Sequence, residues 1–274
     1  MPELPEVETI KRGLIPSLKG NIIKNVILRR KNLRIPFPEN LQQALEGQKI
    51  EGIKRRSKYL IFELNSNDCM IMHLGMSGKV LVKEKKPEEF EKHDHIIIEF
   101  SDGKTLVFND ARRFGLVTLC KKSELEKHKL FSALGPEPLS NNFNEEVLYN
   151  ALRNKSSPIK NAIMDAHVVV GVGNIYACES LFRSGLSPLK KSSSISKKKI
   201  GELTANIINV LNEAIESGGS TLKDYVHANG EMGYFQHSFQ VYGREGEDCG
   251  TCLKAIKRVK QLGRSTFYCP NCQK

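Results

Sequence analysis

The 274-residue sequence has no run of about 18 or more apolar residues, so it lacks a membrane-spanning helix of ordinary length. Its N-terminus also lacks the basic region and the apolar stretch of a secretory signal peptide, and carries acidic residues there instead. No internal repeat or low-complexity tract is present. These absences lead us to expect a globular protein in the cytoplasm or nucleus.

Cysteine is scarce and unevenly placed. Of the seven cysteines, four lie in the last 26 residues and the other three are scattered along the chain. This distribution is unlike the disulfide framework of a small secreted protein. We therefore interpret Cys69, Cys120 and Cys178 as reduced thiols.

Positive charge is plentiful. Lys and Arg number 42 against 31 Asp and Glu, which gives a formal charge of +11 and a pI near 9.3. A basic balance of this size favours a polyanionic partner such as nucleic acid. The apolar content of 39% is enough to build cores for two or three domains.

The first half of the chain shows mainly β patterns after a short helical pattern from Pro5 to Leu18. At least seven short strands without intervening helices predict a sandwich or barrel rather than a parallel α/β sheet. A segment with two prolines and one glycine, residues 134–140, marks the end of this part. The expected strands lie at 21–30, 58–64, 69–74, 79–83, 95–100, 104–108 and 114–119.

The second half has helical periodicity. Helical patterns cover 141–154 and 174–185, and a long apolar stripe runs through Ile200, Leu203, Ile207, Leu211 and Ile215. Residues 218–233 are rich in Gly, Ser, Asp and Asn, so we expect a long mobile loop there.

Four cysteines near the C-terminus have the spacing of a structural zinc site. Two Cys-x2-Cys pairs are separated by sixteen residues, and each pair can offer two thiolates to one tetrahedral ion: Cys249, Cys252, Cys269 and Cys272. Basic residues between the pairs alternate with Ile256, Val259 and Leu262, which predicts a β-hairpin with one basic face.

Several motifs along the chain resemble bacterial formamidopyrimidine-DNA glycosylase. They occur in one order: MPELPEVE (1–8), KYL (58–60), HLGMSG (73–78), DARRFG (110–115), VGVGNIYACESLF (170–182), GYFQHSFQVYGREGE (233–247) and the four cysteines. The resemblance implies an α+β multidomain fold. Its expected parts are an N-terminal catalytic β-sandwich domain (1–133), a helix-two-turns-helix DNA-binding domain with a lesion-side loop (134–233) and a zinc finger (234–274).

The resemblance also implies an activity. The expected enzyme is a monomeric, bacterial, cytoplasmic glycosylase and abasic-site lyase, associated with the nucleoid through DNA, that removes 8-oxoguanine and formamidopyrimidines from double-stranded DNA. Two alternatives stay open at this point. One is an endonuclease VIII-like glycosylase for oxidised pyrimidines, and the other is a non-catalytic protein that binds damaged DNA.

Pro2 is the expected nucleophile, once Met1 is removed. An α-amine titrates near ~8, well below the ~10.4 of lysine, so a useful fraction is neutral at pH 7. A secondary amine that attacks the sugar C1′ forms a cationic iminium, which serves as an electron sink for elimination of the phosphates. The resemblance implies that Glu3 acts as general acid and base. Glu6 and Glu8 fall at a helix start, and we interpret them as at least partly structural.

The resemblance assigns roles to further residues. Lys58 and Arg264 are implied to contact phosphate at the lesion and to assist the elimination. Met76, Arg112 and Phe114 are implied to fill the space left by the extruded nucleotide, with Arg112 bonded to the orphaned base. Other implied DNA contacts are His73, His93, Lys155, Asn174 and Tyr242.

Overall fold

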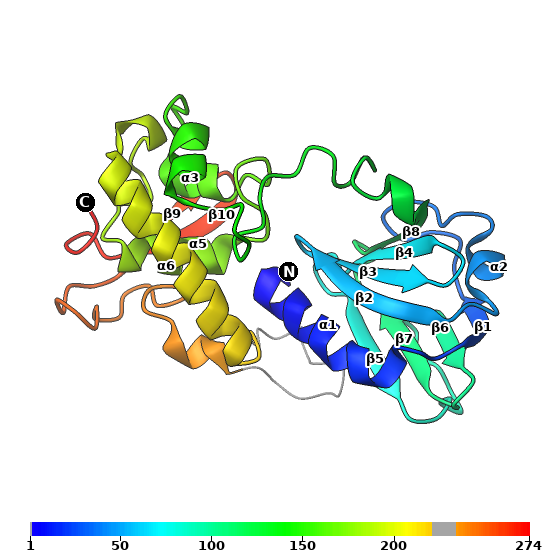
Figure 1. Ribbon diagram of the computed structural model, residues 1–274. Coiled ribbons are helices and arrows are strands. Elements are labelled where there is room, and N and C mark those ends of the chain that lie inside the picture. The colour runs from blue at the N-terminus through cyan, green and yellow to red at the C-terminus, as the bar shows by residue number, and fades with distance from the viewer. Residues whose placement is uncertain (1, 221–233) are drawn as a thin grey trace. The chain divides into compact units, whose positions relative to one another are not determined.

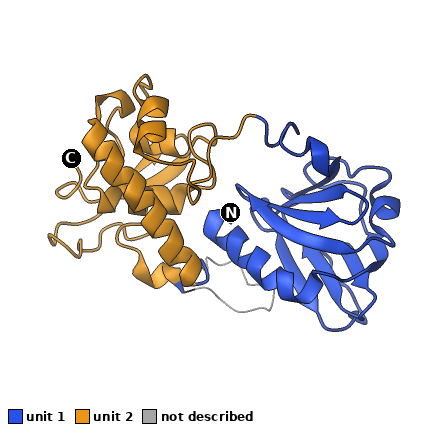
Figure 2. Ribbon diagram, viewed as in Figure 1, with its two compact units in different colours: residues 1–132, 218–234 blue, residues 133–217, 235–274 orange. Residues whose placement is uncertain are grey.

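The computed structural model describes residues 2–220 and 234–274 (Figure 1). Met1 and residues 221–233, which hold most of the predicted 218–233 loop, lie outside the described residues. The chain divides into two compact units (Figure 2): residues 1–132 with 218–234 form unit 1, and residues 133–217 with 235–274 form unit 2. The boundaries of the three domains expected from the sequence stay a prediction.

The described residues of unit 1 form two four-stranded antiparallel sheets. One has the strand order β1-β6-β7-β5 and the other β2-β3-β4-β8. The strands are β1 (Ile23–Leu28), β2 (Ile50–Arg56), β3 (Tyr59–Leu64), β4 (Asp68–His73), β5 (Lys79–Lys83), β6 (Asp94–Phe100), β7 (Thr105–Asn109) and β8 (Leu116–Lys121).

One apolar core joins the two sheets of unit 1. Both sheets contribute buried residues to it, as do helix α1 (Leu4–Leu18) and the short helix α2 (Leu41–Leu45). Helix α1 contributes Val7, Ile10, Leu14 and Leu18, which recur at helical spacing and are all buried. The helix packs on β2, β3 and β5 (Figure 1). The predicted β-sandwich is therefore confirmed.

Strand β2 was not among the strands expected from the sequence. Its pairing with β3 shifts register between Ile50 and Gly52, so the buried residues Ile50 and Ile53 are three positions apart. The irregularity breaks the two-residue alternation by which a half-buried strand is recognised. The remaining positions are polar or glycine, which hides the strand further.

Unit 2 contains the helices that the periodicity predicted, α3, α5 and α6, together with the short helix α4, which it did not predict. The apolar stripe of α6 (Lys197–Glu216) is buried, and the helix packs against α3 and α5. Asn144 caps α3 by accepting a hydrogen bond from the N–H of Val147 at 3.0 Å. The other helices are α3 (Glu145–Leu152), α4 (Ile159–Ile163) and α5 (Asn174–Arg183), with short 3-10 turns η1 (Lys122–Glu124, unit 1), η2 (Ser192–Ser194) and η3 (Phe235–Ser238).

The predicted hairpin near the C-terminus is present as β9 (Lys257–Gln261) and β10 (Arg264–Tyr268). One detail of the prediction was wrong, because Leu262 does not alternate onto an apolar face. It is 83% exposed and has φ 45° in the two-residue turn, beside Gly263 with φ 76°. The register Gln261–Arg264 closes the hairpin at this turn and leaves Leu262 at its tip.

Candidate functional site

The expected nucleophile lies at the start of α1. Pro2 is buried, and Glu3 is the N-cap of the helix with 4% of its surface exposed. The N–H of Glu3 donates to Glu6 Oε2 at 2.8 Å, and Glu6 Oε1 accepts from the N–H and the hydroxyl of Ser220, both at 2.9 Å. Glu6 thus ties the start of α1 to the residue that precedes 221–233. The sequence could not reveal this contact because its partners are 214 positions apart.

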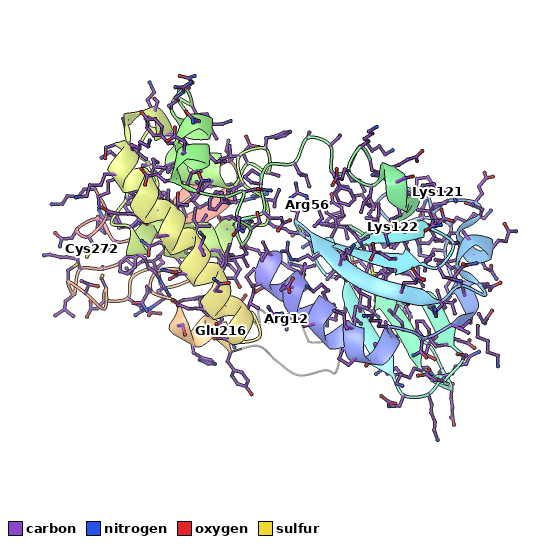
Figure 3. The ribbon with its side chains drawn as sticks, in the orientation of Figure 1. Arg12, Arg56, Lys121, Lys122, Glu216 and Cys272 are labelled. Carbon is purple, nitrogen blue, oxygen red and sulfur yellow. The ribbon has the colours of Figure 1, made fainter. Side chains whose placement is uncertain are left out.

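Lys58 lies in the two-residue turn between β2 and β3, and its side chain is half-buried. Figure 3 labels Arg56, which ends β2 directly before this turn, and Arg12 on α1. Because α1 packs directly on β2, the structure brings the elements that carry Pro2, Glu3 and Lys58 together within one unit.

The three residues expected to fill the space of an extruded nucleotide are exposed on two turns that touch. Met76 is 38% exposed, Phe114 is 45% exposed, and the Arg112 guanidinium lies 5.1 Å from the centre of the Phe114 ring. Gly75 has φ 65°, and a Cβ there would stand 2.3 Å from the backbone carbonyl carbon of Phe114. Only glycine permits this approach, which sets Met76 beside Phe114.

A buried carboxylate holds these two turns. Asp110 is fully buried and accepts from the hydroxyl of Ser77 at 2.6 Å and from the N–H of Gly115 at 2.7 Å. The Ser77 hydroxyl in turn accepts from the N–H of Arg112 at 3.1 Å. The Met76 turn and the Arg112 to Phe114 turn are therefore one braced structure. Sequence reasoning missed Ser77 and Asp110, although both lie inside the motifs that it quoted.

His73 ends β4 and is held as a neutral ring. Burial, with help from Lys58 and Arg34, lowers its pKa to about 4. Its Nδ1 accepts from the N–H of Gly75 at 3.0 Å, so the neutral ring carries its proton on Nε2, where it can donate to an acceptor. His93 is half-buried, and its ring centre lies 6.2 Å from that of His95.

In unit 2, Lys155 and Arg264 line the same cavity, which measures about 420 Å³. Lys160 and Asp165 are also among the residues that line this cavity. Lys155 Nζ lies 3.2 Å from Asp165 Oδ2, so the two residues form an ion pair. An excess of positive charge around a cavity of this kind suits a phosphate group.

Asn174 opens α5 and is anchored on both sides. Its Oδ1 accepts from Lys160 Nζ at 2.5 Å, and its Nδ2 donates to the carbonyl of Ser265 on β10 at 2.8 Å. Lys160 is completely buried. Lys160 was not among the residues expected from the sequence, and a lysine between the apolar residues Ile159 and Ala162 of α4 was the available signal.

Tyr242 is placed by a buried glutamate on α5. Glu179 is 1% exposed and accepts from the N–H groups of Gln240, Val241 and Tyr242 at 2.8 to 3.0 Å. Burial raises the pKa of Glu179, while the three backbone hydrogen bonds act in the opposite direction. The Tyr242 ring packs edge-on against Phe267 of β10, with centres 5.1 Å apart.

The four C-terminal cysteines converge on one point. Their Sγ atoms all lie within 4.8 Å of one another, with 3.9 Å between Cys249 and Cys272 and 3.4 Å between Cys252 and Cys269. Thiolates around a tetrahedral zinc ion, each bonded at about 2.3 Å, stand about 3.8 Å apart. The donor set and its spacing fit one structural zinc ion, as predicted.

Three family descriptions match successive parts of the chain. Residues 1–117 match the formamidopyrimidine-DNA glycosylase N-terminal domain, and residues 134–226 match the formamidopyrimidine-DNA glycosylase H2TH domain. Residues 246–274 match the zinc finger found in FPG and IleRS.

Individual proteins are similar over the whole chain. The formamidopyrimidine-DNA glycosylase of Dinoroseobacter shibae is 49% identical, with 100% of both chains covered. A Lactococcus lactis FPG mutant in complex with a Fapy-dG containing DNA has a TM-score of 0.93 at 35% identity, with 100% of both chains covered. The Lactococcus lactis Fpg in complex with an abasic site containing DNA has a TM-score of 0.92 at 35% identity and covers 99% of each chain. This chain therefore belongs to the formamidopyrimidine-DNA glycosylase family.

Proposed function

We propose that this chain is a base-excision repair enzyme, a bifunctional glycosylase and abasic-site lyase that removes oxidised purines from double-stranded DNA. The observation that carries the proposal is the buried Pro2–Glu3 pair at the N-terminus of α1, in a chain of this family. The positive end of a helix disfavours a second positive charge, so an α-amine beside it is favoured in its neutral, nucleophilic form.

The reaction follows from this amine. The nitrogen of Pro2 attacks the sugar C1′, the damaged base leaves, and the iminium that remains withdraws electrons from the sugar. Successive β- and δ-elimination then release both phosphates. Glu3 serves as general acid and base next to the sugar, because its carboxyl is nearly buried and adjoins the nucleophile.

Lys58 and Arg264 assist at the phosphates. Lys58 stands on a turn of the unit that carries Pro2, and Arg264 lines the basic cavity with Lys155. The planar fork of Arg264 can bind two phosphate oxygens at once. Support for a phosphate in this cavity comes from the basic residues that line it, Lys155, Lys160 and Arg264.

The remaining residues hold the DNA in an opened state. Met76 and Phe114 fill the stack where the damaged nucleotide has turned out, and Arg112 bonds to the base opposite. Their exposure on two braced turns supports this role. His73 donates from Nε2, and His93, Asn174 and Tyr242 complete the contacts with the backbone.

Zinc would be held by Cys249, Cys252, Cys269 and Cys272, and its role is structural. When bound it fixes the two loops that carry these thiolates at the base of the β9–β10 hairpin.

We further propose that the enzyme works as a monomer in the cytoplasm. Among the described residues, no helix is both long and apolar enough to cross a membrane.

Borohydride trapping tests the proposal. The purified protein is mixed with an 8-oxoguanine:cytosine duplex and reductant, and the cross-linked peptide is mapped by mass spectrometry. We expect a covalent adduct at Pro2. The Pro5→Ala variant is the matched control, because it removes a neighbouring proline of α1 but not the amine, and it should be trapped at Pro2 as well.

The alternatives give different outcomes. Much faster cleavage of a thymine-glycol duplex than of the 8-oxoguanine duplex would identify an enzyme for oxidised pyrimidines. Specific binding without any adduct, or complete retention of Met1 by intact mass, would exclude Pro2 as nucleophile and leave a damage-binding protein.

A further inference from the structure

The turn that carries Lys58 has an unfavourable residue at its first position. Strands β2 and β3 are joined by Ser57 and Lys58 alone, because Arg56 pairs with Tyr59. Ser57 has φ 55°, whereas Lys58 is not among the residues with positive φ. Positive φ at the first turn residue only is the pattern of a type II′ turn, which favours glycine there. The serine therefore needs help from its surroundings to hold this conformation.

Arg55 supplies that help. Its Nη1 donates to the carbonyl oxygen of Ser57 at 2.9 Å, and its Nε donates to Glu8 Oε2 at 2.9 Å. The Arg55 side chain is only 9% exposed. The bond to the carbonyl fixes the peptide unit between Ser57 and Lys58, and the orientation of this unit sets the direction in which the Lys58 side chain leaves the turn.

Glu8 anchors the arginine to α1. Its Oε1 accepts from Lys11 at 2.7 Å and from Arg12 at 3.1 Å, so both oxygens are bound by cations (Figure 3 labels Arg12). Burial raises the pKa of Glu8, but hydrogen bonds and charges of Lys11 and Arg55 outweigh it and lower the pKa overall. Glu8 is therefore ionised at neutral pH, and a chain of charge-assisted bonds runs from α1 to the Lys58 turn.

We propose that Glu8 and Arg55 are positioning residues, which hold the Ser57–Lys58 turn so that the Lys58 ammonium stays aligned with the amine at the start of α1. A buried ion pair adds little stability over a well-packed apolar pair. The Glu8–Arg55 pair is therefore explained by the geometry that it imposes on the Ser57–Lys58 turn, rather than by added stability. The inference rests on the proposed function, since it assumes that Lys58 takes part in the elimination.

The expected effect is on the chemical step. A displacement of about 1 Å in a reacting group can cost about a hundredfold in rate. Arg55→Met keeps most of the buried volume but loses the hydrogen bonds to Glu8 and to the carbonyl of Ser57, while Lys11 and Arg12 still compensate the charge of Glu8. We expect cleavage of a preformed abasic-site duplex under single-turnover conditions to slow by about 10- to 100-fold. Affinity for a duplex with an uncleavable tetrahydrofuran site, and its dependence on salt, should stay within about twofold of wild type.

A second substitution separates positioning from direct contact. Ser57→Gly favours the positive φ without assistance, so the double variant Arg55→Met with Ser57→Gly should recover at least about fivefold of the lost rate.

Arg12→Met is the matched control, because Arg12 contacts the same carboxylate but its side chain is 60% exposed, and it should cleave at the wild-type rate. Ser57→Val, which disfavours positive φ while Arg55 is present, should slow cleavage as Arg55→Met does. The Ser57→Val result keeps the test decisive if Arg55→Met does not fold.

Three results would overturn the inference. The first is an Arg55→Met variant that cleaves as fast as wild type, and the second is no recovery of the cleavage rate by Ser57→Gly. The third is a slope of log affinity against log salt that Arg55→Met makes shallower by about one, which would make Arg55 a DNA contact. Failure of the proposed function looks different, because the wild-type protein would then neither cleave abasic DNA nor be trapped at Pro2.

Discussion

Two arginines of the β9–β10 hairpin show how neighbours decide the use of a side chain. Arg258 bonds to Glu245 at 3.2 Å and to the Ser265 hydroxyl at 3.0 Å, so its charge is already compensated. Arg264 lines the basic cavity beside Lys155 and Lys160. The two residues belong to one hairpin, yet their surroundings favour phosphate binding only for Arg264.

This contrast predicts different salt dependences. Arg264→Ala should make the slope of log affinity for duplex DNA against log salt shallower by roughly one, because one phosphate contact is lost. Arg258→Ala should change the slope by much less, since its charge is paired with Glu245. Titrations of undamaged duplex at several salt concentrations measure both slopes. Equal slopes for the two variants would contradict the phosphate role of Arg264.

At the scale of an element, the end of β4 combines a strand terminus with a glycine turn. His73 is the last residue of the strand, and its ring accepts the N–H of Gly75, two positions on. The turn thus determines the tautomer of the ring, and burial keeps the ring neutral. The same turn presents Met76, so the histidine and the expected wedge residue depend on one local structure.

The neutral His73 predicts an acid-sensitive stability. Its pKa falls from the ordinary value of 6.5 to about 4 on folding, so the unfolded chain binds the proton more tightly. The stabilisation is present above pH 6.5 and is lost as the pH falls towards about 4. It amounts to at most about 3 kcal/mol. Urea unfolding between pH 4 and 7 should show a smaller decline for His73→Gln than for wild type.

The control for this experiment is the exposed His237. His237→Gln should follow the wild-type pH dependence, because this exposed substitution leaves the His73 ring and its bond from Gly75 unchanged. Identical declines for wild type and His73→Gln would show that the ring is not held neutral.

At the scale of the molecule, the zinc-binding segment is part of unit 2 rather than an appendage. Cys178 of α5 and Val241 pack with Ile256, Phe267 and two of the zinc-binding cysteines in one apolar cluster. Gln273 accepts from the N–H of Cys269 at 2.8 Å and donates to the carbonyl of Leu186 at 2.9 Å. Metal binding therefore supports the packing of α5 as well as the hairpin.

Removal of zinc should affect the two units unequally. A chelator should weaken DNA binding and lower the melting midpoint of unit 2 by more than about 10 °C, because several kcal/mol of folding free energy are lost. Unit 1 has its own core and should keep its midpoint. Calorimetry with and without chelator measures both transitions. Cys120→Ser, outside the finger, should respond to chelation as wild type does, and unchanged DNA binding after complete zinc loss would contradict the assignment.

Local patterns were sufficient for the elements that follow simple periods. The stripe of α6, seven of the eight strands described in unit 1 and the spacing of the zinc ligands could be read directly, because each depends on residues close in the sequence. Strand β2 escaped because its register shift removes the alternation on which recognition depends. The roles of Pro2, Glu3 and Lys58 came from motif resemblance and remain proposals.

The sequence by itself determined the elements with a regular period, the metal site and the family. Tertiary structure alone decided what holds the candidate site: the bond from Glu6 to Ser220, the brace of Asp110 on Ser77 and Gly115, and the link from Glu8 through Arg55 to the Lys58 turn. These contacts join residues up to 214 positions apart. Neither periodicity nor spacing encodes such pairs, because side chains so far apart in the chain meet only when the sheets and helices have packed.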